Sequence, residues 1–292
     1  MKRILVTGAR GFVGSHWFES SHLRDQSVPV SLQSQGVSEV NFDGIDTVVH
    51  MAGIAHRMGQ PSGSIYYEVN RDMTLALARR ARQAGVQQFV YLSSVKVMGD
   101  EDGYFDENSL PQPVDDYGKS KFEAEAGLSD LACPDFTVSI VRPPLVYGPR
   151  VKGNVLRIMD LIARQWPLPL DGIENARSMV YVLNLVALIE RVIELRAGGV
   201  FIAGDAAPIS TTQLVRGLAQ GMGLGSSARH FALPRWVQAG VSRTFPKIGR
   251  RLFESYVVSN ADTNHRLQFE PPTPSLTALI ETGRSYQRPL VT

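Results

Sequence analysis

Tyr117 and Lys121 stand four residues apart in the hydrophilic stretch 116–121. If this stretch is helical, both side chains lie on one face of the helix, with their Cβ atoms roughly 6 Å apart. A nearby ammonium group favours phenolate over phenol and so lowers the pKa of a tyrosine. The pair is therefore a candidate proton donor or acceptor near neutral pH. An ordinary solvated helix can show the same spacing, so the rest of the chain must support this interpretation.

A glycine pattern near the amino terminus indicates a binding site for phosphate groups. Residues 4–6 form a short apolar run, Gly8, Gly11 and Gly14 follow, and a helix is expected over residues 15–23. Glycines so placed between a strand and a helix permit a tight turn, close approach of the backbone to a pyrophosphate, and packing of the helix on the strand. The amino end of the helix then offers N–H groups to the phosphates. This context favours dinucleotide binding over a purely structural turn.

The elements around these residues alternate between strands and helices, which predicts a Rossmann-type, doubly wound parallel sheet of the α/β class. Further strands are expected over residues 28–32, 47–51, 89–92 and 137–141, and helices over residues 68–84 and 117–131. Ala52-Gly53 and Ser93-Ser94 follow two of these strands, at the sheet edge where such folds bind ligands. We interpret His50 as a strand residue with satisfied hydrogen bonds rather than as a catalyst.

The second half of the chain predicts a smaller, mostly helical lobe. Helices are expected over residues 155–164, 183–195, 211–222 and 275–286, strands over 177–182 and 199–204, and a basic helical stretch over 235–251. Residues 99–114 are expected to form a surface loop. We assign residues 1–150 to a dinucleotide-binding domain, to which residues 177–206 return, and residues 151–176 and 207–292 to a substrate-binding lobe.

Composition narrows the possible partners. The chain has 292 residues with 43% hydrophobic residues, which is enough for a large core. Its net charge of +2 argues against nucleic acid or a membrane surface as the main partner. The single cysteine, Cys133, excludes an intrachain disulfide and fits a reducing cytoplasm. We find no signal peptide, and the apolar stretch 179–195 is too polar to span a bilayer. A cytoplasmic protein acting on a small molecule is expected.

Four motifs occur together in one order: Thr7-Gly8-x-x-Gly11-x-x-Gly14, Ser93-Ser94, Tyr117-x-x-x-Lys121, and Arg142-Pro143 followed by Val146-Tyr147-Gly148-Pro149. This combination resembles the extended short-chain dehydrogenase/reductase family of NAD(P)-dependent epimerases, dehydratases and reductases of nucleotide sugars. The resemblance covers the chain to about Gly204 and implies a homodimer formed by helices 68–84 and 117–131. Small residues that would permit the helices to approach their copies are Ala76, Ala78, Ala81, Ala124 and Ala126.

The resemblance also implies roles for individual residues. Tyr117 would be the catalytic acid or base, Lys121 its activator and a ribose ligand, and Ser94 a hydrogen-bond partner of the reacting oxygen. The implied cofactor-binding residues are Gly8, Arg10, Gly11, Phe12, Val13, Gly14, Ala52, Asn70, Ser93, Tyr117, Lys121 and Pro144. Arg177 would pair with a substrate diphosphate and Asn154 would line the nucleotide-sugar site. Lys96 could touch a substrate oxygen or be a solvated lysine. No metal site is expected.

Two departures from the family pattern bear on the reaction. Ser178 and Asn184 replace the two acids of the family motif R-D-x-x-x-V-x-D, which weakens the match around Arg177. Val95-Lys96 follow Ser94 where the 4,6-dehydratases of the family carry an Asp-Glu pair. Because no carboxylate is available at this point, the sequence argues against dehydration.

The whole pattern is most similar to bacterial reductases and epimerases that act at C4 of UDP-hexoses for cell-surface polysaccharide. Both reactions use the same residues, so the sequence leaves them open. A non-catalytic regulator that senses NADP(H) is disfavoured by the Tyr117–Lys121 pair. An enzyme for a steroid or flavonoid-like ketone is disfavoured by Arg177 and Asn154, which suit a diphosphate.

The cofactor prediction depends on the end of the second strand. Gln33-Ser34-Gln35 stand where an NAD site would carry the acid that holds the ribose hydroxyls. Arg10 precedes Gly11, where a guanidinium could reach an adenosine 2′-phosphate. We therefore favour NADP(H) over NAD, and with it the 4-ketoreductase over the epimerase.

Overall fold

Six parallel strands form the central sheet of the computed structural model, which describes residues 3–54, 63–99, 103–225, 230–245, 249 and 252–286. Their order is β10-β6-β4-β3-β1-β2. The strands are β1 (Ile4–Thr7), β2 (Ser27–Val30), β3 (Thr47–His50), β4 (Gln88–Leu92), β6 (Thr137–Arg142) and β10 (Gly199–Ile202). All neighbouring pairs are parallel, so the predicted doubly wound sheet and the return of the chain near residue 200 are confirmed.

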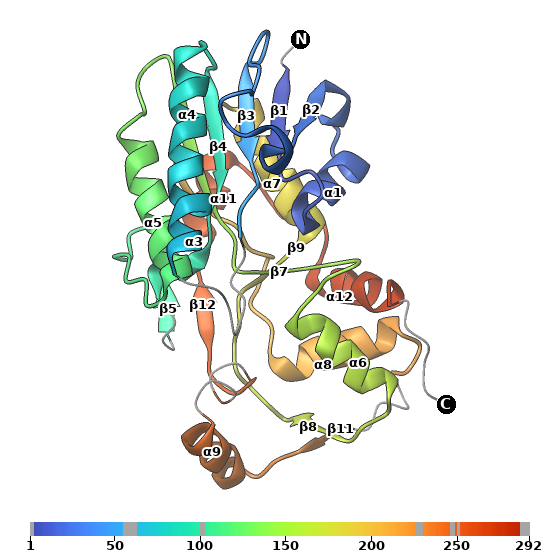
Figure 1. Ribbon diagram of the computed structural model, residues 1–292. Coiled ribbons are helices and arrows are strands. Elements are labelled where there is room, and N and C mark those ends of the chain that lie inside the picture. Colours follow the sequence, from blue (N-terminus) through green and yellow to red (C-terminus); the bar gives the residue numbers. More distant parts are fainter. Residues whose placement is uncertain are drawn as a thin grey trace.

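Helices cover both faces of this sheet, which is why its central strands are almost entirely buried. Figure 1 shows α4 (Met73–Gln83) and α5 (Asp116–Ser129) on one side, and α1 (Phe12–Ser20) and α7 (Val182–Glu194) on the other. The first pair packs Leu77, Ala124 and Leu128 into one buried core. The second pair packs Trp17 and Ile189 into the other. α1 begins three residues before the predicted start, directly after Gly11.

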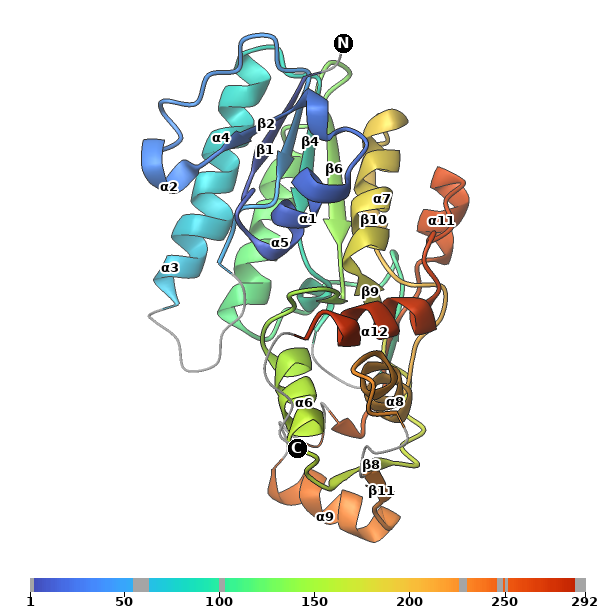
Figure 2. The same cartoon turned by 90° about the vertical axis from the view of Figure 1, so that its right-hand side faces the viewer.

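The small lobe lies beyond the carboxyl ends of the sheet strands (Figure 2). It contains α6 (Asn154–Ala163), α8 (Thr211–Gly221), α9 (Arg235–Thr244) and α12 (Ser275–Arg284), and β8 (Leu168–Asp171) paired with β11 (His230–Ala232). Met159, Leu218 and Leu279 share one hydrophobic core with sheet residues such as Val141. The lobe is therefore fastened to the sheet by a continuous apolar interior.

Several short elements were not predicted. β5 (Gly103–Phe105) lies inside the predicted loop 99–114 and pairs in parallel with β12 (Tyr256–Val258). The strand predicted over residues 177–182 is present as β9 (Met179–Tyr181), but it pairs with β7 (Leu145–Tyr147) instead of joining the central sheet, so only β10 of the segment 177–206 returns to it. The remaining elements are two 3₁₀-helices, η1 (Arg24–Gln26) and η3 (Val95–Met98), one π-helix, η2 (Tyr67–Asp72), and three short α-helices, α2 (Leu32–Gln35), α3 (Ser64–Tyr66) and α11 (Ala261–Leu267). Residues 246–248 and 250–251 of the predicted basic helix lie outside the described residues.

The structure corrects the set of alanines proposed for a dimer interface. Ala78, Ala81 and Ala124 are fully buried against the sheet, so they cannot contact a second copy. Ala76 is half-buried and Ala126 is exposed. Only the outer faces of α4 and α5 remain open to such a contact.

Candidate active site

Tyr117 and Lys121 lie in the first turns of α5, as the spacing predicted. The helix begins after Asp115, whose carboxylate accepts a hydrogen bond of 2.7 Å from the Gly118 N–H. The buried Lys121 Nζ donates a hydrogen bond of 2.9 Å to the carbonyl of Leu92. Lys121 Nζ also lies 4.6 Å from the ring centre of Tyr91. The lysine is thus directed at the carboxyl end of β4, the ligand-binding edge of a parallel sheet.

Ser94 meets Tyr117 at this edge. A hydrogen bond joins the Ser94 hydroxyl to Tyr117. Ser94 is also the N-cap of η3, where its Oγ accepts from the Lys96 N–H at 3.2 Å. A Cβ at Gly118 would lie 2.7 Å from the Lys96 carbonyl oxygen. The missing side chain at Gly118 therefore lets α5 approach η3 closely enough for Tyr117 to reach Ser94.

The protonation states follow from burial. Burial raises the pKa of Tyr117 to about 12, although its hydrogen bond with Ser94 acts in the opposite direction. Burial lowers the pKa of the Lys121 ammonium to about 8, with the Glu125 carboxylate opposing the shift. The expectation of a lowered Tyr117 pKa is wrong for this structure, because desolvation of the buried phenolate raises the pKa instead. At neutral pH Tyr117 is a phenol and therefore a proton donor.

A buried ion pair supports this arrangement, and sequence reasoning missed it. Arg142 Nη2 lies 2.6 Å from Glu125 Oε2, and both side chains are almost fully buried. Glu125 follows Lys121 by four residues, so its place one turn further along the same helix face could have been read from the spacing. The pair joins α5 to the end of β6 and places a carboxylate near the Lys121 ammonium.

The loop between β1 and α1 has the form expected for a phosphate cradle. Gly8 has φ of 78°, and a Cβ there would lie 2.6 Å from the Ala52 nitrogen, so the loop packs against the end of β3. Gly11 donates its N–H to the Gly8 carbonyl at 2.8 Å. No side chain caps the amino end of α1, where Phe12 and Val13 begin the helix. Their N–H groups suit phosphate oxygens.

Other predicted cofactor residues line the same edge. Gly14 packs on the Gly8 carbonyl, Arg10 is exposed beside the loop, and Pro144 is buried just after β6. Asn70 is buried and bonds both the N–H and the carbonyl of Ile54, at 2.9 and 3.1 Å. It therefore fastens the loop that follows β3, and its predicted contact with a cofactor stays a prediction.

Ser93 gives an independent sign of a polar ligand. Its hydroxyl is the one buried side-chain polar atom without a hydrogen-bond partner among the residues that the structure describes. Buried hydroxyls are normally hydrogen-bonded, so an unpaired hydroxyl at the end of β4 suits a ligand with a polar group. Together with the uncapped end of α1, it shows that the residues present fit a dinucleotide.

His50, by contrast, has both ring nitrogens engaged. They lie 2.7 Å from Thr7 Oγ1 and 2.9 Å from Thr74 Oγ1. Burial lowers the pKa of His50 to about 3, with the Lys121 charge acting in the same direction. The interpretation of His50 as a satisfied strand residue is confirmed.

The three predicted substrate residues lie in different elements. Lys96 is half-buried in η3, beside Ser94. Asn154 is exposed at the first position of α6. Arg177 donates from Nη1 to the Glu254 carbonyl at 3.0 Å. A bridge pairs Arg177 with Tyr256, whose hydroxyl donates to the Val95 carbonyl at 3.0 Å, so Arg177 is tied to η3 through one residue.

The two departures around Arg177 have structural explanations. The Ser178 hydroxyl donates to the Val258 carbonyl and accepts from the Val258 N–H, which holds β12 in place. The Asn184 amide donates to Asp205 Oδ1 at 2.7 Å. An aspartate at position 184 would place two carboxylates against each other there, so the neutral side chain fits this buried site.

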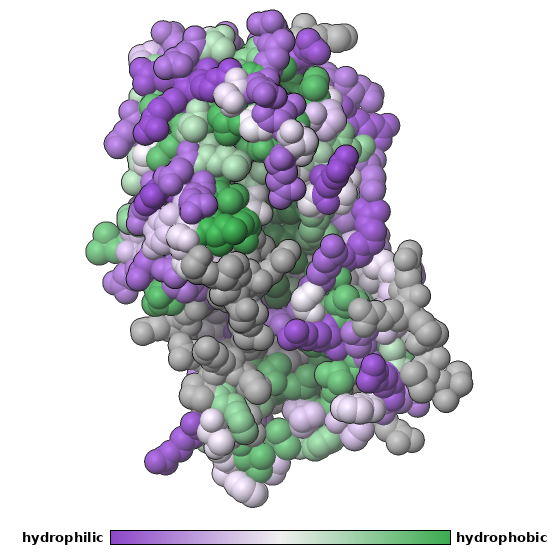
Figure 3. Space-filling view, in the orientation of Figure 1, coloured by the Kyte–Doolittle hydropathy of each residue, from purple (hydrophilic) through white to green (hydrophobic). Residues whose placement is uncertain are grey.

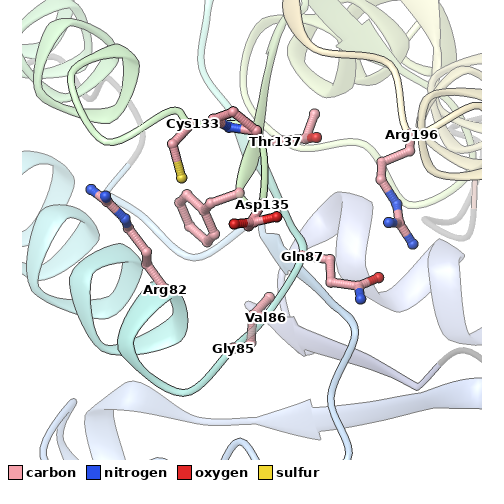
Figure 4. Close-up of a pocket in the computed structure, with 10 residues that line it drawn as sticks. Arg82, Gly85, Val86, Gln87, Cys133, Asp135, Thr137 and Arg196 are labelled. Carbon is pink, nitrogen blue, oxygen red and sulfur yellow. The ribbon is translucent and has the colours of Figure 1, made fainter.

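Figure 4 shows a pocket at the opposite edge of the sheet, where β4 and β6 begin. Its lining includes Arg82, Cys133, Asp135 and Arg196, and none of the predicted site residues.

Within the described ranges, no helix is long and apolar enough to cross a membrane.

Comparison with known proteins identifies the family. The model of the NAD dependent epimerase/dehydratase family matches residues 4–204. A UDP-glucose 4-epimerase of Vibrio cholerae is 32% identical over an alignment of 315 positions, which covers 98% of this chain and 95% of the relative. An N-acetyl-alpha-D-glucosaminyl-diphospho-ditrans,octacis-undecaprenol 4-epimerase of Escherichia coli O157:H7 is 28% identical, covering 88% of this chain and 83% of the relative.

Solved structures share the fold. The structure of RMD from Pseudomonas aeruginosa complexed with NADPH superposes with a TM-score of 0.77 at 20% identity, over 98% of each chain. This chain belongs to the NAD dependent epimerase/dehydratase family. It is accordingly an enzyme of the epimerase/dehydratase type that works with a nicotinamide cofactor.

Proposed function

We propose that this protein inverts the configuration at C4 of a UDP-hexose, using an NAD that stays bound through the reaction. The observation that carries the proposal is the meeting of Ser94 and Tyr117 above Lys121, at the carboxyl edge of the sheet and beside the glycine loop. The 32% identity with a 4-epimerase over nearly the whole chain supports C4 as the position of the reaction.

The residues divide the work between proton transfer and orientation. When bound, a nicotinamide supplies the acceptor and later the donor of hydride. In the first half of the reaction, Tyr117 takes the proton of the C4 hydroxyl, and Ser94 hydrogen-bonds the same oxygen. This step needs Tyr117 as a phenolate, so the proposal requires the Lys121 ammonium to offset, once substrate is bound, the burial that raises the pKa of Tyr117 to about 12. In the second half, after the 4-keto sugar has rotated to present its other face, Tyr117 returns the proton to the oxygen.

The substrate diphosphate is assigned to Arg177. The V. cholerae relative is named for a UDP sugar and the E. coli relative for a sugar on diphospho-undecaprenol, so a diphosphate is common to both names. A guanidinium offers a planar fork of donors that suits phosphate oxygens. Asn154, and Lys96 beside Ser94, are assigned to the remainder of the nucleotide sugar.

A 4-keto-hexose reductase using NADPH is the second candidate. In that reaction Tyr117 only donates its proton, which agrees with its raised pKa of about 12. No acidic residue stands directly after β2, where α2 contains Gln33 and Ser34. Arg10 is exposed in the glycine loop. These features favour a 2′-phosphate. A non-catalytic regulator would have no use for the assembled Ser94, Tyr117 and Lys121.

Mass spectrometry of the purified protein, followed by assays with each cofactor, separates the candidates. The epimerase predicts that NAD co-purifies and that UDP-hexoses interconvert without added cofactor. The reductase predicts stoichiometric oxidation of NADPH with a 4-keto sugar, and loss of the preference for NADPH over NADH in Arg10→Ser. Absence of both activities on every UDP-hexose tested would refute an action at C4.

A further inference from the structure

The charge of the chain is unevenly distributed, and the near-neutral total conceals this. Between Asp205 and Glu254 the sequence contains no acidic residue and seven cationic ones. These are Arg216, Arg229, Arg235, Arg243, Lys247, Arg250 and Arg251. Since the whole chain carries only +2, the rest of the chain is net acidic. The near-neutral average charge therefore does not exclude a membrane-surface partner for this segment.

The same segment exposes large aromatic side chains. We call residues 231–245, from β11 through α9, the tip. Trp236 is 78% exposed, Phe245 56% and Phe231 47%. Trp166, 57% exposed, precedes β8, the strand that pairs with β11. Figures 1 and 2 place α9 with β8 and β11 at the end of the molecule away from the central sheet, and Figure 3 shows hydrophobic side chains at this end.

The described side chains of α9 lie outside the hydrophobic interior. None of its described side chains belongs to the buried cores or to the residues packed against them. Trp236, Gly240 and Arg243 follow at helical spacing, and all three are exposed. A surface helix normally buries its apolar stripe, so exposed aromatic side chains beside cations need another explanation.

We propose that the tip docks on the surface of an anionic phospholipid bilayer. Tryptophan and phenylalanine favour the boundary between headgroups and acyl chains, and the exposed Arg243 on the same helix favours anionic headgroups. The acid-free sequence between Asp205 and Glu254 complements such a surface in charge, although Arg216 already pairs with Asp171 of β8 at 2.7 Å. A second copy of this chain, docked tip to tip, would bring two cationic segments together, and their repulsion makes it a less favourable partner than the bilayer. Docking at the tip leaves the glycine loop and Tyr117, on the sheet side of the lobe, away from the lipid.

Co-sedimentation of the full-length protein with vesicles tests the proposal. Vesicles of phosphatidylcholine with phosphatidylglycerol should bind the protein, and vesicles of phosphatidylcholine alone should not. Added salt should weaken the binding. Trp236→Ser should lower the partition coefficient roughly tenfold, because the indole no longer buries its apolar surface. Arg243→Gln should lower it about fivefold, which corresponds to about 1 kcal/mol per arginine at an anionic surface.

Two control variants match these changes away from the tip. Leu110→Ser removes an apolar side chain that is also 78% exposed, and Arg196→Gln removes an exposed arginine after α7. Both should bind vesicles like the wild type. Equal binding to the two vesicle types, no binding at low salt, or equal losses in the controls would overturn the proposal. So would a Trp236→Ser variant that binds vesicles normally but changes from dimer to monomer. Because the readout is binding, it does not depend on the proposed reaction.

Discussion

Burial, more than sequence spacing, decides the chemistry of single residues in this protein. The spacing of Tyr117 and Lys121 predicted that the two would share a helix face directed at the sheet edge. It could not predict that the pKa of Tyr117 is raised to about 12, because desolvation depends on the side chains that surround the ring. Ser93 shows the same limit, since only the structure shows that its hydroxyl lacks a partner.

Tyr117→Phe removes the proposed proton donor and acceptor while keeping the ring. We expect kcat to fall by roughly 10²–10⁴-fold, the usual range for a lost acid–base group. Circular dichroism and NAD binding should match the wild type. Tyr104→Phe, at an exposed tyrosine of β5, is the control and should be fully active. Turnover near the wild-type rate in Tyr117→Phe would remove Tyr117 from the reaction.

His50 predicts a pH dependence of folding stability. Its pKa is about 3 in the folded protein, against an ordinary value of 6.5 in the unfolded chain. Between these values only the unfolded chain takes up the proton, so the free energy of unfolding falls as the pH falls below about 6.5. The slope from this residue is at most about 1.4 kcal/mol per pH unit. Urea unfolding at pH 7 and pH 5 should show a drop about 1–2 kcal/mol larger for the wild type than for His50→Gln. Equal drops would contradict the buried neutral imidazole.

At the scale of elements, the contact between helix α5 and the short helix η3 positions the reacting groups. The long apolar strands and periodic helices were predictable, because each shows its pattern locally. The pairs β5–β12 and β7–β9 were not, since each strand has three residues and its partner lies far away in sequence. The close approach at Gly118 is also invisible in the sequence, because it depends on the Lys96 carbonyl from another element.

Gly118→Ala tests this contact. The added Cβ would lie 2.7 Å from the Lys96 carbonyl oxygen, so α5 must move away from η3 and Tyr117 away from Ser94. We expect kcat to fall about tenfold or more, with KM changed little, because misplacement weakens the transition state more than substrate binding. Gly240→Ala is the matched control, since a Cβ at this helical glycine meets nothing within 4 Å. A fully active Gly118→Ala variant would show that this approach is not needed.

At the scale of the whole molecule, one apolar interior joins the sheet to the small lobe and holds the lobe against the carboxyl ends of the strands. The division into a cofactor-binding domain and a substrate-binding lobe, read from composition and element order, stays a prediction. The partial return of residues 177–206 did not follow from the sequence, because β9 pairs outside the central sheet. The uneven charge of the lobe was present in the sequence but was hidden in the total.

We expect a homodimer through the outer faces of α4 and α5, now without the three buried alanines. Ala126 is exposed on α5, and arginine there would place a long charged side chain in the interface. Light scattering at micromolar concentration should give twice the chain mass for the wild type and a lower mass for Ala126→Arg. Ala207→Arg, at an exposed position after β10, should leave the mass unchanged. A wild-type protein with the mass of one chain would refute the dimer.

The most direct test of the central claim is the fate of the hydrogen at C4. UDP-glucose carrying deuterium at C4 should be incubated with the purified protein in ordinary water, without added cofactor, and the hexose products followed by NMR and mass spectrometry. If the protein removes hydride from C4 and returns it to the other face, UDP-galactose forms and retains deuterium at C4. Loss of the deuterium to solvent, or inversion at another carbon, would contradict the account. So would complete absence of C4 inversion with UDP-glucose and with its 2-acetamido and 6-carboxyl analogues.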